Sequence, residues 1–554
     1  MALLAQAARL SRLTDPSRRA ASPASISLPM LLAVSFAARV PAILWSRGYT
    51  FFDEQFQYLD PAHHLATGAP FLQTHEWVSG IRSWVFPGIV AGFLRVARWL
   101  GVEGPENELC VVRLCLGLFS LLAVYGVFEL VRAARLAQYR TAVLLLGANN
   151  GILVYQGVHP NGAAFSCGLV VFGLGLVAAP GKVRALVAGL AVGLAACCRP
   201  QDGLFAASIC VMGIATRRFR DIGAFAAGSL TMVLVQGLVD VHTWGGFLHS
   251  GIEYVRFNLA HSSDWGGQSP FTYLMVVLLL APLAHTGLRL TFASGMRLPW
   301  VAFAVLVSLL AHQVLDRRAP RFVTPSLALI ILFWAIGIAI VWPARTARAR
   351  GLAGSLGLAA LLQVGLFCAA SLGYANRHRI ETVLYLESAR ATGIAYCGLS
   401  PIDSGGAFYH RSRAHRTYID AAELPSLLAC DPRISHVVAR AHTPIPLPPR
   451  WRLAREAVFD AVWDPHHRQT YVVYRVRVAH PGRTEHPPRS GRPSSKAWTV
   501  ADAPPTWRAA SGEARPKPAG YSSASTSSCG ASCASRTLLS TSSKIALLPP
   551  SPIR

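Results

Sequence analysis

Residues 110–131 read CVVRLCLGLFSLLAVYGVFELV, an apolar run interrupted by only two charged positions, Arg113 and Glu129. A helix of about 20 such residues rises 1.5 Å per residue and crosses the ~30 Å hydrocarbon core of a bilayer. Similar runs recur along the chain and predict an all-α polytopic membrane protein with about 11 transmembrane helices. The other runs lie at 28–45, 141–158, 163–179, 185–198, 203–215, 222–239, 271–288, 298–315, 322–342 and 352–373.

The composition also points to a membrane protein. Hydrophobic residues make up 52% of the 554 residues, charged residues make up 14%, and the mean hydropathy is +0.38. Soluble domains carry roughly 25% charged residues, so a soluble enzyme is excluded, and the long apolar runs exclude a disordered chain. The net charge of +25 lies mainly in short loops, which favours membrane topology over a nucleic-acid partner.

The basic loops orient the chain. Arginines in residues 1–27 predict a cytoplasmic tail, and the positive-inside rule is then met by the later inside loops, at 132–140, 180–184, 216–221, 289–297 and 343–351. Val85–Leu100 is apolar too, but a crossing there would invert every later loop, so we expect a re-entrant or interfacial helix. Loop 46–109 then lies outside. Arginine supplies most of the basic residues, which favours a bacterial inner membrane over the endoplasmic reticulum membrane of a eukaryote.

The sequence changes character after the last apolar run. Residues 374–480 are more polar and predict a small extracytoplasmic α/β domain, in which Cys397 and Cys430 could pair in an oxidising space. Residues 481–554 are basic and rich in serine and proline, so we expect them to be disordered. The expected strands and helix of the α/β domain are 393–397, 436–439, 471–478 and 421–429.

Polar residues on the expected outer side form an acidic group early in the chain and a cationic group late. Asp53 and Glu54 lie in the catalytic outer loop 46–109, whereas Arg317, Arg318 and Arg321 lie on a loop that the positive-inside rule leaves unexplained. A carboxylate can take the proton of an acceptor hydroxyl, which is typically worth about 10²–10⁴ in rate, and arginines stabilise a leaving phosphate. Together they predict sugar transfer from a lipid-linked phosphosugar, which requires no metal and no other cofactor.

Simpler interpretations stay open. Asp53 and Glu54 could be solvated loop charges, and His63 and His64 fit a helix surface better than a metal site, since no zinc-type spacing accompanies them. Arg199 precedes a proline and could merely end a helix. A transporter or flippase for a lipid-linked glycan would also explain charges near the membrane, although neither an inverted repeat nor paired broken helices are evident.

Short motifs stand in a fixed order along the outer loops. They are Asp53-Glu54, Gln57, Glu76-Trp77, Gly80–Trp84, Pro87, Pro160–Gly162, Arg199-Pro200, Asp240, Trp244, Glu253–Asn258 and Arg321-Phe322. In this order they resemble the lipid-linked mannosyltransferases of glycosyltransferase family 22, which include the GPI-anchor and N-glycan mannosyltransferases. The family's His-Lys-Glu-x-Arg-Phe motif is only partly kept, because its glutamate is missing, and Asp316 could take over that role.

The resemblance implies the multispan GT-C fold and an inverting transfer of mannose. The donor would be a polyprenyl- or dolichyl-phosphate mannose, and the product would be an α-mannoside on a glycan or glycolipid acceptor at the non-cytoplasmic face. Asp53 would be the general base, with Glu54 assisting, and Arg317, Arg318 and Arg321 would bind the donor phosphate. The implied substrate-binding residues are Gln57, Glu76, Trp77, Arg82, Asp240 and Asn258. A GT-C enzyme that moves another sugar or modifies a protein is the alternative.

Overall fold

The computed structural model describes residues 26–136, 140–261, 267–280, 297–341, 371–412, 414–448, 450–462 and 464–478, with single positions between 294 and 368. Almost all of the expected cytoplasmic tail, most of the expected span 352–373 and the expected disordered tail 481–554 lie outside the described residues. The described residues up to Arg477 belong to one compact unit.

Helices form at the predicted apolar runs between residues 28 and 342, wherever the structure describes them. Apolar side chains can cover these helices because hydrocarbon or other helices surround them, and the backbone polar groups are satisfied within each helix. The helices are α2 (Leu28–Trp45), α6 (Pro105–Ala133), α7 (Arg140–Ala148), α8 (Gly151–Tyr155), α9 (Gly162–Val177), α10 (Lys182–Cys198), α11 (Gly203–Ala215), α12 (Phe219–Trp244), α14 (Thr272–Leu280), α16 (Pro299–Gln313) and α17 (Thr324–Val341).

The chain is a multi-pass membrane protein. Among the described helices, α2, α6, α12 and the segment Pro320–Gly337 are long and apolar enough to cross a bilayer. A fifth crossing results if α7 and the segment Gly151–Val158, bent by 49° to each other, count as one. Other apolar helices, such as α9 and α16, are shorter than 18 residues. The count of about 11 spans therefore stays a prediction.

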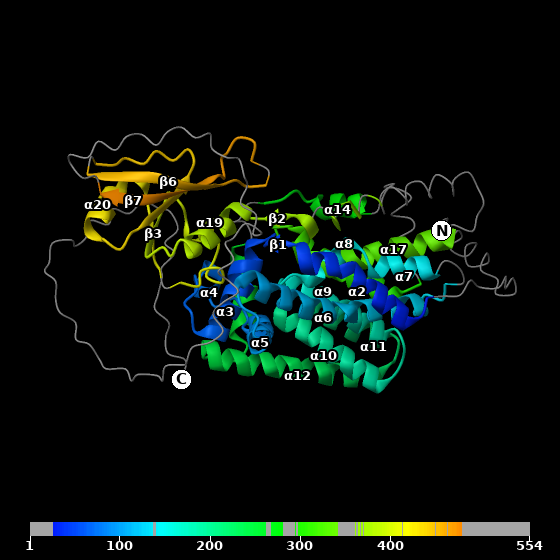
Figure 1. Ribbon diagram of the computed structural model, residues 1–554. Coiled ribbons are helices and arrows are strands. Elements are labelled where there is room, and N and C mark those ends of the chain that lie inside the picture. Colours follow the sequence, from blue (N-terminus) through cyan, green and yellow to red (C-terminus); the bar gives the residue numbers. More distant parts are fainter. Residues whose placement is uncertain are drawn as a thin grey trace. The chain divides into compact units, whose positions relative to one another are not determined.

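Glycines allow the helices to pack closely. A Cβ atom on Gly126 of α6 would overlap the backbone of Val171 on α9, and one on Gly189 of α10 would overlap the backbone of Phe225 on α12. Small residues at crossings let helix backbones approach each other in membranes. α6 consequently lies beside α9, and α10 lies beside α12 (Figure 1).

The expected catalytic loop is largely helical. It contains a π-helical turn, which is a rare conformation often found at functional sites. The predicted re-entrant segment forms α5, whose Phe86, Val90 and Leu94 are buried; its depth in the membrane stays a prediction. The elements here are η1 (Asp53–Leu59), α3 (Asp60–Thr67), α4 (His75–Val78) and α5 (Val85–Trp99), and later in the chain η2 (Gln156–Val158), η3 (Pro200–Asp202), α13 (His249–Ala260) and η4 (Pro320–Val323).

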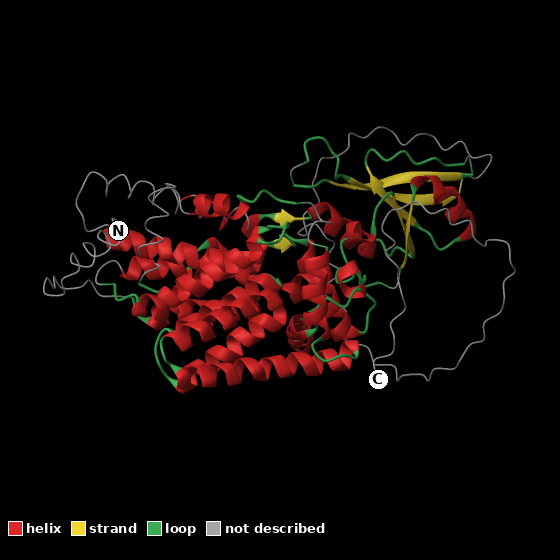
Figure 2. Ribbon diagram, turned by 180° about the vertical axis from the view of Figure 1, so that it is seen from behind, coloured by secondary structure: helices red, strands yellow, loops and turns green. Residues whose placement is uncertain are grey.

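A five-stranded sheet of order β4-β3-β5-β7-β6 dominates the C-terminal part (Figure 2). β3 is parallel to β4 and β5, while β5 is antiparallel to β7. Separately, β1 (Arg47–Gly48) pairs with β2 and ties loop 46–109 to this part. The elements are β2 (Tyr374–Ala375), α19 (Arg377–Ser388), β3 (Gly393–Cys397), η5 (Pro401–Ser404), β4 (His415–Ile419), η6 (Ala421–Glu423), α20 (Leu424–Cys430), β5 (His436–Arg440), β6 (Trp451–Phe459) and β7 (Tyr471–Val478).

The expected strands coincide with β3, β5 and β7, and the expected helix coincides with η6 and α20. β4 and β6 were not predicted because they are the two edge strands, and an edge strand carries polar residues that hide the apolar signal. Cys397 is buried in β3, Cys430 is exposed, and both are free thiols. That residues 374–480 form an independent extracytoplasmic domain stays a prediction.

Candidate active site

A cavity of about 580 Å³ lies where η1, η3, η4 and α13 meet. Its walls come from segments that are far apart in the sequence, so the fold must bring them together. Six of the residues predicted for the site line this cavity: Asp53, Glu76, Arg82, Asn258, Arg317 and Arg321.

Asp53 and Arg321 form an ion pair inside the cavity. The Arg321 Nη1 atom lies 3.2 Å from Asp53 Oδ2, and the side chains are 27% and 25% exposed. The Arg321 guanidinium also lies over the ring of Phe51, 6.0 Å from its centroid, and over the ring of Phe322, at 5.6 Å. Because both charged groups stay partly accessible, one bound molecule can contact the carboxylate and the guanidinium together.

Glu76 and Arg82 supply a second charged pair, with Arg82 Nη2 3.6 Å from Glu76 Oε1. Burial alone would raise the pKa of Glu76. The Arg82 charge and hydrogen bonds with Thr74 and Gln57 outweigh burial, so the pKa of Glu76 lies below its ordinary value. Glu76 is therefore a carboxylate at neutral pH and can accept hydrogen bonds from hydroxyl groups.

Several cavity residues were not assigned from the sequence. Arg199 Nη1 donates to the Arg321 carbonyl at 2.9 Å, which fixes the loop that carries the Asp53 partner. In the amide orientation that satisfies its neighbours, Gln201 donates to the Tyr254 hydroxyl at 2.9 Å and accepts from Arg199 Nε at 2.8 Å. The Arg199-Pro200 motif was a signal for this group, although it also fitted a helix end.

Five residues predicted for the site do not line the cavity: Glu54, Gln57, Trp77, Asp240 and Arg318. Trp77 is 2% exposed and packs on the rings of Trp84 and Trp244, with centroids 4.4 and 6.2 Å away. Asp240 is fully buried and accepts hydrogen bonds from Ser250 N at 2.9 Å and from Gln236 at 2.8 Å. These two residues hold α12, α13 and loop 46–109 together.

Two more of these residues bond to groups that do not line the cavity themselves. Gln57 Nε2 donates to Thr74 Oγ1 at 2.9 Å, next to Glu76. Arg318 donates to the carbonyls of Gln313, at 3.2 Å, and Gln268, at 2.6 Å. Asp316, the candidate for the missing family glutamate, does not line the cavity either. Any contact of these groups with a substrate is therefore indirect in this conformation.

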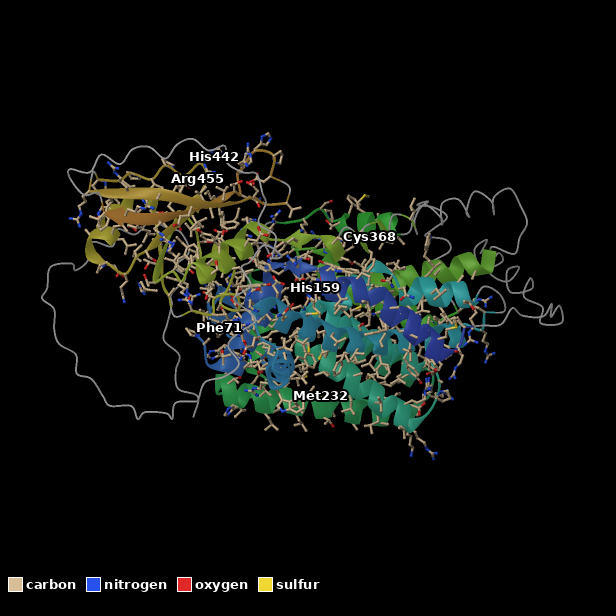
Figure 3. The ribbon with its side chains drawn as sticks, viewed as in Figure 1. Phe71, His159, Met232, Cys368, His442 and Arg455 are labelled. Atoms are coloured by element: carbon tan, nitrogen blue, oxygen red, sulfur yellow. The ribbon has the colours of Figure 1, made fainter. Side chains whose placement is uncertain are left out.

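Glu54 forms a buried pair with His159, the histidine labelled in Figure 3. His159 Nδ1 lies 3.4 Å from Glu54 Oε2, and both side chains are 1% exposed. The same carboxylate oxygen accepts a hydrogen bond from Thr50 N at 3.0 Å. Glu54 thus anchors the start of η1 to the segment before α9.

The adjacent histidines His63 and His64 have separate packing partners. The His63 ring lies edge-on to Phe408, with centroids 5.6 Å apart, and the His64 ring lies 5.2 Å from that of Phe71. Within the described part of the chain, no three histidine, cysteine or acidic side chains gather in a way that could hold a metal ion.

The cavity also has a contribution from the C-terminal part that the sequence did not predict. Ser400, Ile402 and Asp403 line it, although they lie in the turn between β3 and β4. Asp403 Oδ1 accepts a hydrogen bond from Arg379 Nη2 at 2.7 Å. The Arg379 guanidinium in turn lies 4.9 Å from the ring centroid of Phe52, which lines the same cavity.

Asp60 connects this turn to loop 46–109. Its fully buried carboxylate accepts hydrogen bonds from Gln55 Nε2 at 2.6 Å, from Ala407 N at 2.9 Å and from Phe408 N at 2.8 Å. Burial raises the pKa of Asp60 to about 6, although these three donors oppose the shift.

The raised pKa predicts a pH-dependent stability. When the native pKa of a carboxyl group exceeds its ordinary value of about 3.9, the group stabilises the folded protein at pH values below 3.9. This contribution to stability is lost as the pH rises through about 6. Across this pH range the contribution of Asp60 to the free energy of unfolding changes by ~3 kcal/mol. We expect the Tm of the detergent-solubilised wild type to rise between pH 7 and pH 5 relative to that of Asp60→Asn, which cannot titrate. Parallel pH profiles for the two proteins would contradict this prediction.

Known proteins resemble this chain in sequence and in fold. Residues 30–397 match the model of the Alg9-like mannosyltransferase family. GPI mannosyltransferase 3 of Yarrowia lipolytica (strain CLIB 122 / E 150) is 26% identical over 424 residues, which cover 73% of this chain and 78% of that protein. GPI mannosyltransferase 3 of Drosophila melanogaster is 33% identical over 92 residues, 17% of this chain and 16% of that protein.

Among solved structures, ArnT from Cupriavidus metallidurans bound to undecaprenyl phosphate superposes with a TM-score of 0.55 and 11% identity, over 81% of this chain and 97% of that chain. This likeness shows a shared GT-C fold. The family model covers more than half of the chain, so the resemblance based on the outer-loop motifs is confirmed, as is the expectation of a mannosyltransferase. The chain belongs to the Alg9-like mannosyltransferase family.

Proposed function

We propose that this mannosyltransferase moves mannose from polyprenyl- or dolichyl-phosphate mannose to a glycan or glycolipid acceptor, with inversion at the sugar. The observation that carries the proposal is the Asp53–Arg321 pair, 3.2 Å apart in a cavity of about 580 Å³. It combines a carboxylate, which can act as a base, with a cation suited to phosphate, and the reaction needs both.

In the proposed step the acceptor hydroxyl oxygen attacks the anomeric carbon of mannose as the bond from that carbon to the phosphate oxygen breaks. Asp53 takes the hydroxyl proton, and the polyprenyl phosphate leaves with the bonding electron pair. Arg321 and Arg317 stabilise the charge that develops on the phosphate. Donor binding draws Arg321 toward the phosphate and frees Asp53 from its ion pair, so the base is released when the donor is present.

The other predicted residues act at different distances from the reaction. Glu76, Arg82 and Asn258 line the cavity and suit hydrogen bonds with sugar hydroxyls. The indirect positions act by fixing the cavity walls, since each bonds to a lining residue or is next to one in the sequence. These are Glu54, Gln57, Trp77, Asp240 and Arg318.

The relatives guide the proposal for the acceptor. Both carry the name GPI mannosyltransferase 3, which favours a mannose-bearing glycolipid over a protein. The site then lies on the non-cytoplasmic face, as the orientation of the basic loops predicts. A bacterial inner membrane is the proposed location, with the endoplasmic reticulum membrane as its eukaryotic counterpart.

The stereochemistry of the product tests this proposal. A β-linked mannosyl phosphate donor and an inverting transfer give an α-mannoside. We expect the labelled product made by purified protein to release mannose with an α-mannosidase and to resist a β-mannosidase. Release by the β-specific enzyme would show retention and would exclude single-step displacement with Asp53 as the base.

A further inference from the structure

The C-terminal turn (Ser400–Asp403) is built rigidly at the cavity. The Ser400 hydroxyl donates to Asp403 Oδ2 at 2.8 Å, the Ser400 amide donates to the same oxygen at 3.1 Å, and Arg379 holds the other carboxylate oxygen at 2.7 Å. Asp403 keeps its charge, because its hydrogen bonds and the charge of Arg379 outweigh burial and hold its pKa below the ordinary value. The turn is thus a preformed polar surface.

The turn is also fixed to the segment that carries Asp53. Asp60 binds the amides of Ala407 and Phe408, and it binds Gln55 of η1 through the same carboxylate. Gly406 packs directly on the Gln55 side chain, where an added Cβ atom would overlap it, and its φ of +94° also suits only glycine well. A shift of the turn would therefore move η1.

The two phenylalanines that precede Asp53 contact arginines with different surroundings. Phe51 contacts Arg321, which belongs to the cationic group, whereas Phe52 contacts Arg379, whose charge Asp403 already neutralises. The leaving phosphate is attracted to the cationic group. Asp403 also pairs with Arg440, 3.7 Å away, but neither arginine lines the cavity. This wall of the cavity therefore offers a carboxylate and a hydroxyl, which suit a neutral, hydroxyl-rich molecule.

We propose that the C-terminal turn (Ser400–Asp403) is the acceptor subsite of the enzyme and that it recognises the hydroxyl groups of the acceptor glycan. This inference rests on the proposed function, since it presupposes transfer to a glycan. Asp60 and Gly406 are positioning residues, because they act through the turn and η1.

The test places a larger side chain at this wall of the cavity. Ile402 lines the cavity beside Asp403, so Ile402→Trp narrows the proposed subsite without removing a hydrogen bond. The matched control is Ile445→Trp, at a half-buried isoleucine in the loop between β5 and β6 that does not line the cavity. The probes are labelled polyprenyl-phosphate mannose as donor and an alkyl α-mannoside glycolipid as acceptor, with full-length protein in detergent.

We expect Ile402→Trp to raise the KM for the acceptor by at least about tenfold. The KM for the donor and the binding of undecaprenyl phosphate should stay within about twofold of the wild type, as should all values for Ile445→Trp. An unchanged KM for the acceptor, or a raised KM for the donor instead, would overturn the inference. Failure of the wild type itself to transfer mannose would overturn the proposed function.

A glycine pair tests the positioning role separately. Gly406→Ala introduces the overlap with Gln55, whereas Gly398→Ala has a similar positive φ of +61° but only one neighbour, at 3.7 Å. Both variants place an alanine at a positive φ, which is less favourable at +94° than at +61°, and only Gly406→Ala adds the overlap with Gln55. We expect kcat to fall about 10²-fold in Gly406→Ala and much less in Gly398→Ala. Equal losses would show that the contact with η1 does not matter.

Discussion

Replacing Asp53 with asparagine is expected to lower kcat for mannosyl transfer by about 10²–10⁴-fold, the usual contribution of a general base. Asparagine has nearly the same shape and can still accept a hydrogen bond from Arg321, so the donor site should survive. The expected pattern is a low kcat with a nearly unchanged KM for the donor. Steady-state transfer with labelled polyprenyl-phosphate mannose measures both values.

The chain offers a matched control for this variant. Asp431 forms an ion pair of 2.8 Å with Arg433, whose side chain is 64% exposed, in the C-terminal part. Asp431→Asn makes the same chemical change away from the cavity and should leave kcat unchanged. If Asp53→Asn retains wild-type kcat at equal folded concentration, Asp53 is not the base, and Glu76 becomes the next candidate because it is an ionised carboxylate in the same cavity.

The second large effect is expected at Arg321. Arg321→Ala should lower transfer by about 10²–10³-fold, as the loss of one preorganised group that stabilises developing charge usually does. It should also weaken binding of undecaprenyl phosphate, because the phosphate loses a charged partner. Arg321→Lys keeps the charge but loses the planar fork, so it should recover only part of the activity.

Arg433→Ala serves as the control for Arg321→Ala, since it removes an arginine from a comparable carboxylate pair that lies outside the cavity. The double variant Asp53→Asn/Arg321→Ala should lose less than the product of the two single effects, because the two groups act in one step. Undiminished binding of undecaprenyl phosphate by Arg321→Ala would show that Arg321 does not receive the donor phosphate.

Much of the cavity could be predicted because its residues lie in short, ordered motifs. Asp53, Glu76 and Arg82 lie in one loop, and any fold that keeps this loop compact brings them close. Arg321 stood out because a basic group there contradicts the positive-inside rule. At Arg321 a local pattern conflicted with the ordinary structural explanation, and such conflicts are typical of functional sites.

The remaining parts depended on tertiary contacts that leave no local pattern. Tryptophan and aspartate side chains can bind sugars, but they can also pack between helices or cap them. For Trp77 and Asp240, only the burial of the side chain separates the two roles. Ser400 and Asp403 reach the cavity because Asp60 binds backbone amides of a distant segment. Backbone amides leave no pattern in the sequence, because almost every residue type has one. Helices of 15 to 17 residues, such as α10 and α16, are likewise too short for sequence alone to settle each crossing.

The central claim is tested most directly with the full-length protein in lipid vesicles. Labelled polyprenyl-phosphate mannose and an acceptor glycolipid are supplied to the wild type and to Asp53→Asn in equal amounts. Label is followed both in the glycolipid and across the bilayer. Our account predicts label in the glycolipid with the wild type and a rate about 10²–10⁴-fold lower with the variant. Equal rates, or intact donor crossing the bilayer with no label in the glycolipid, would contradict it.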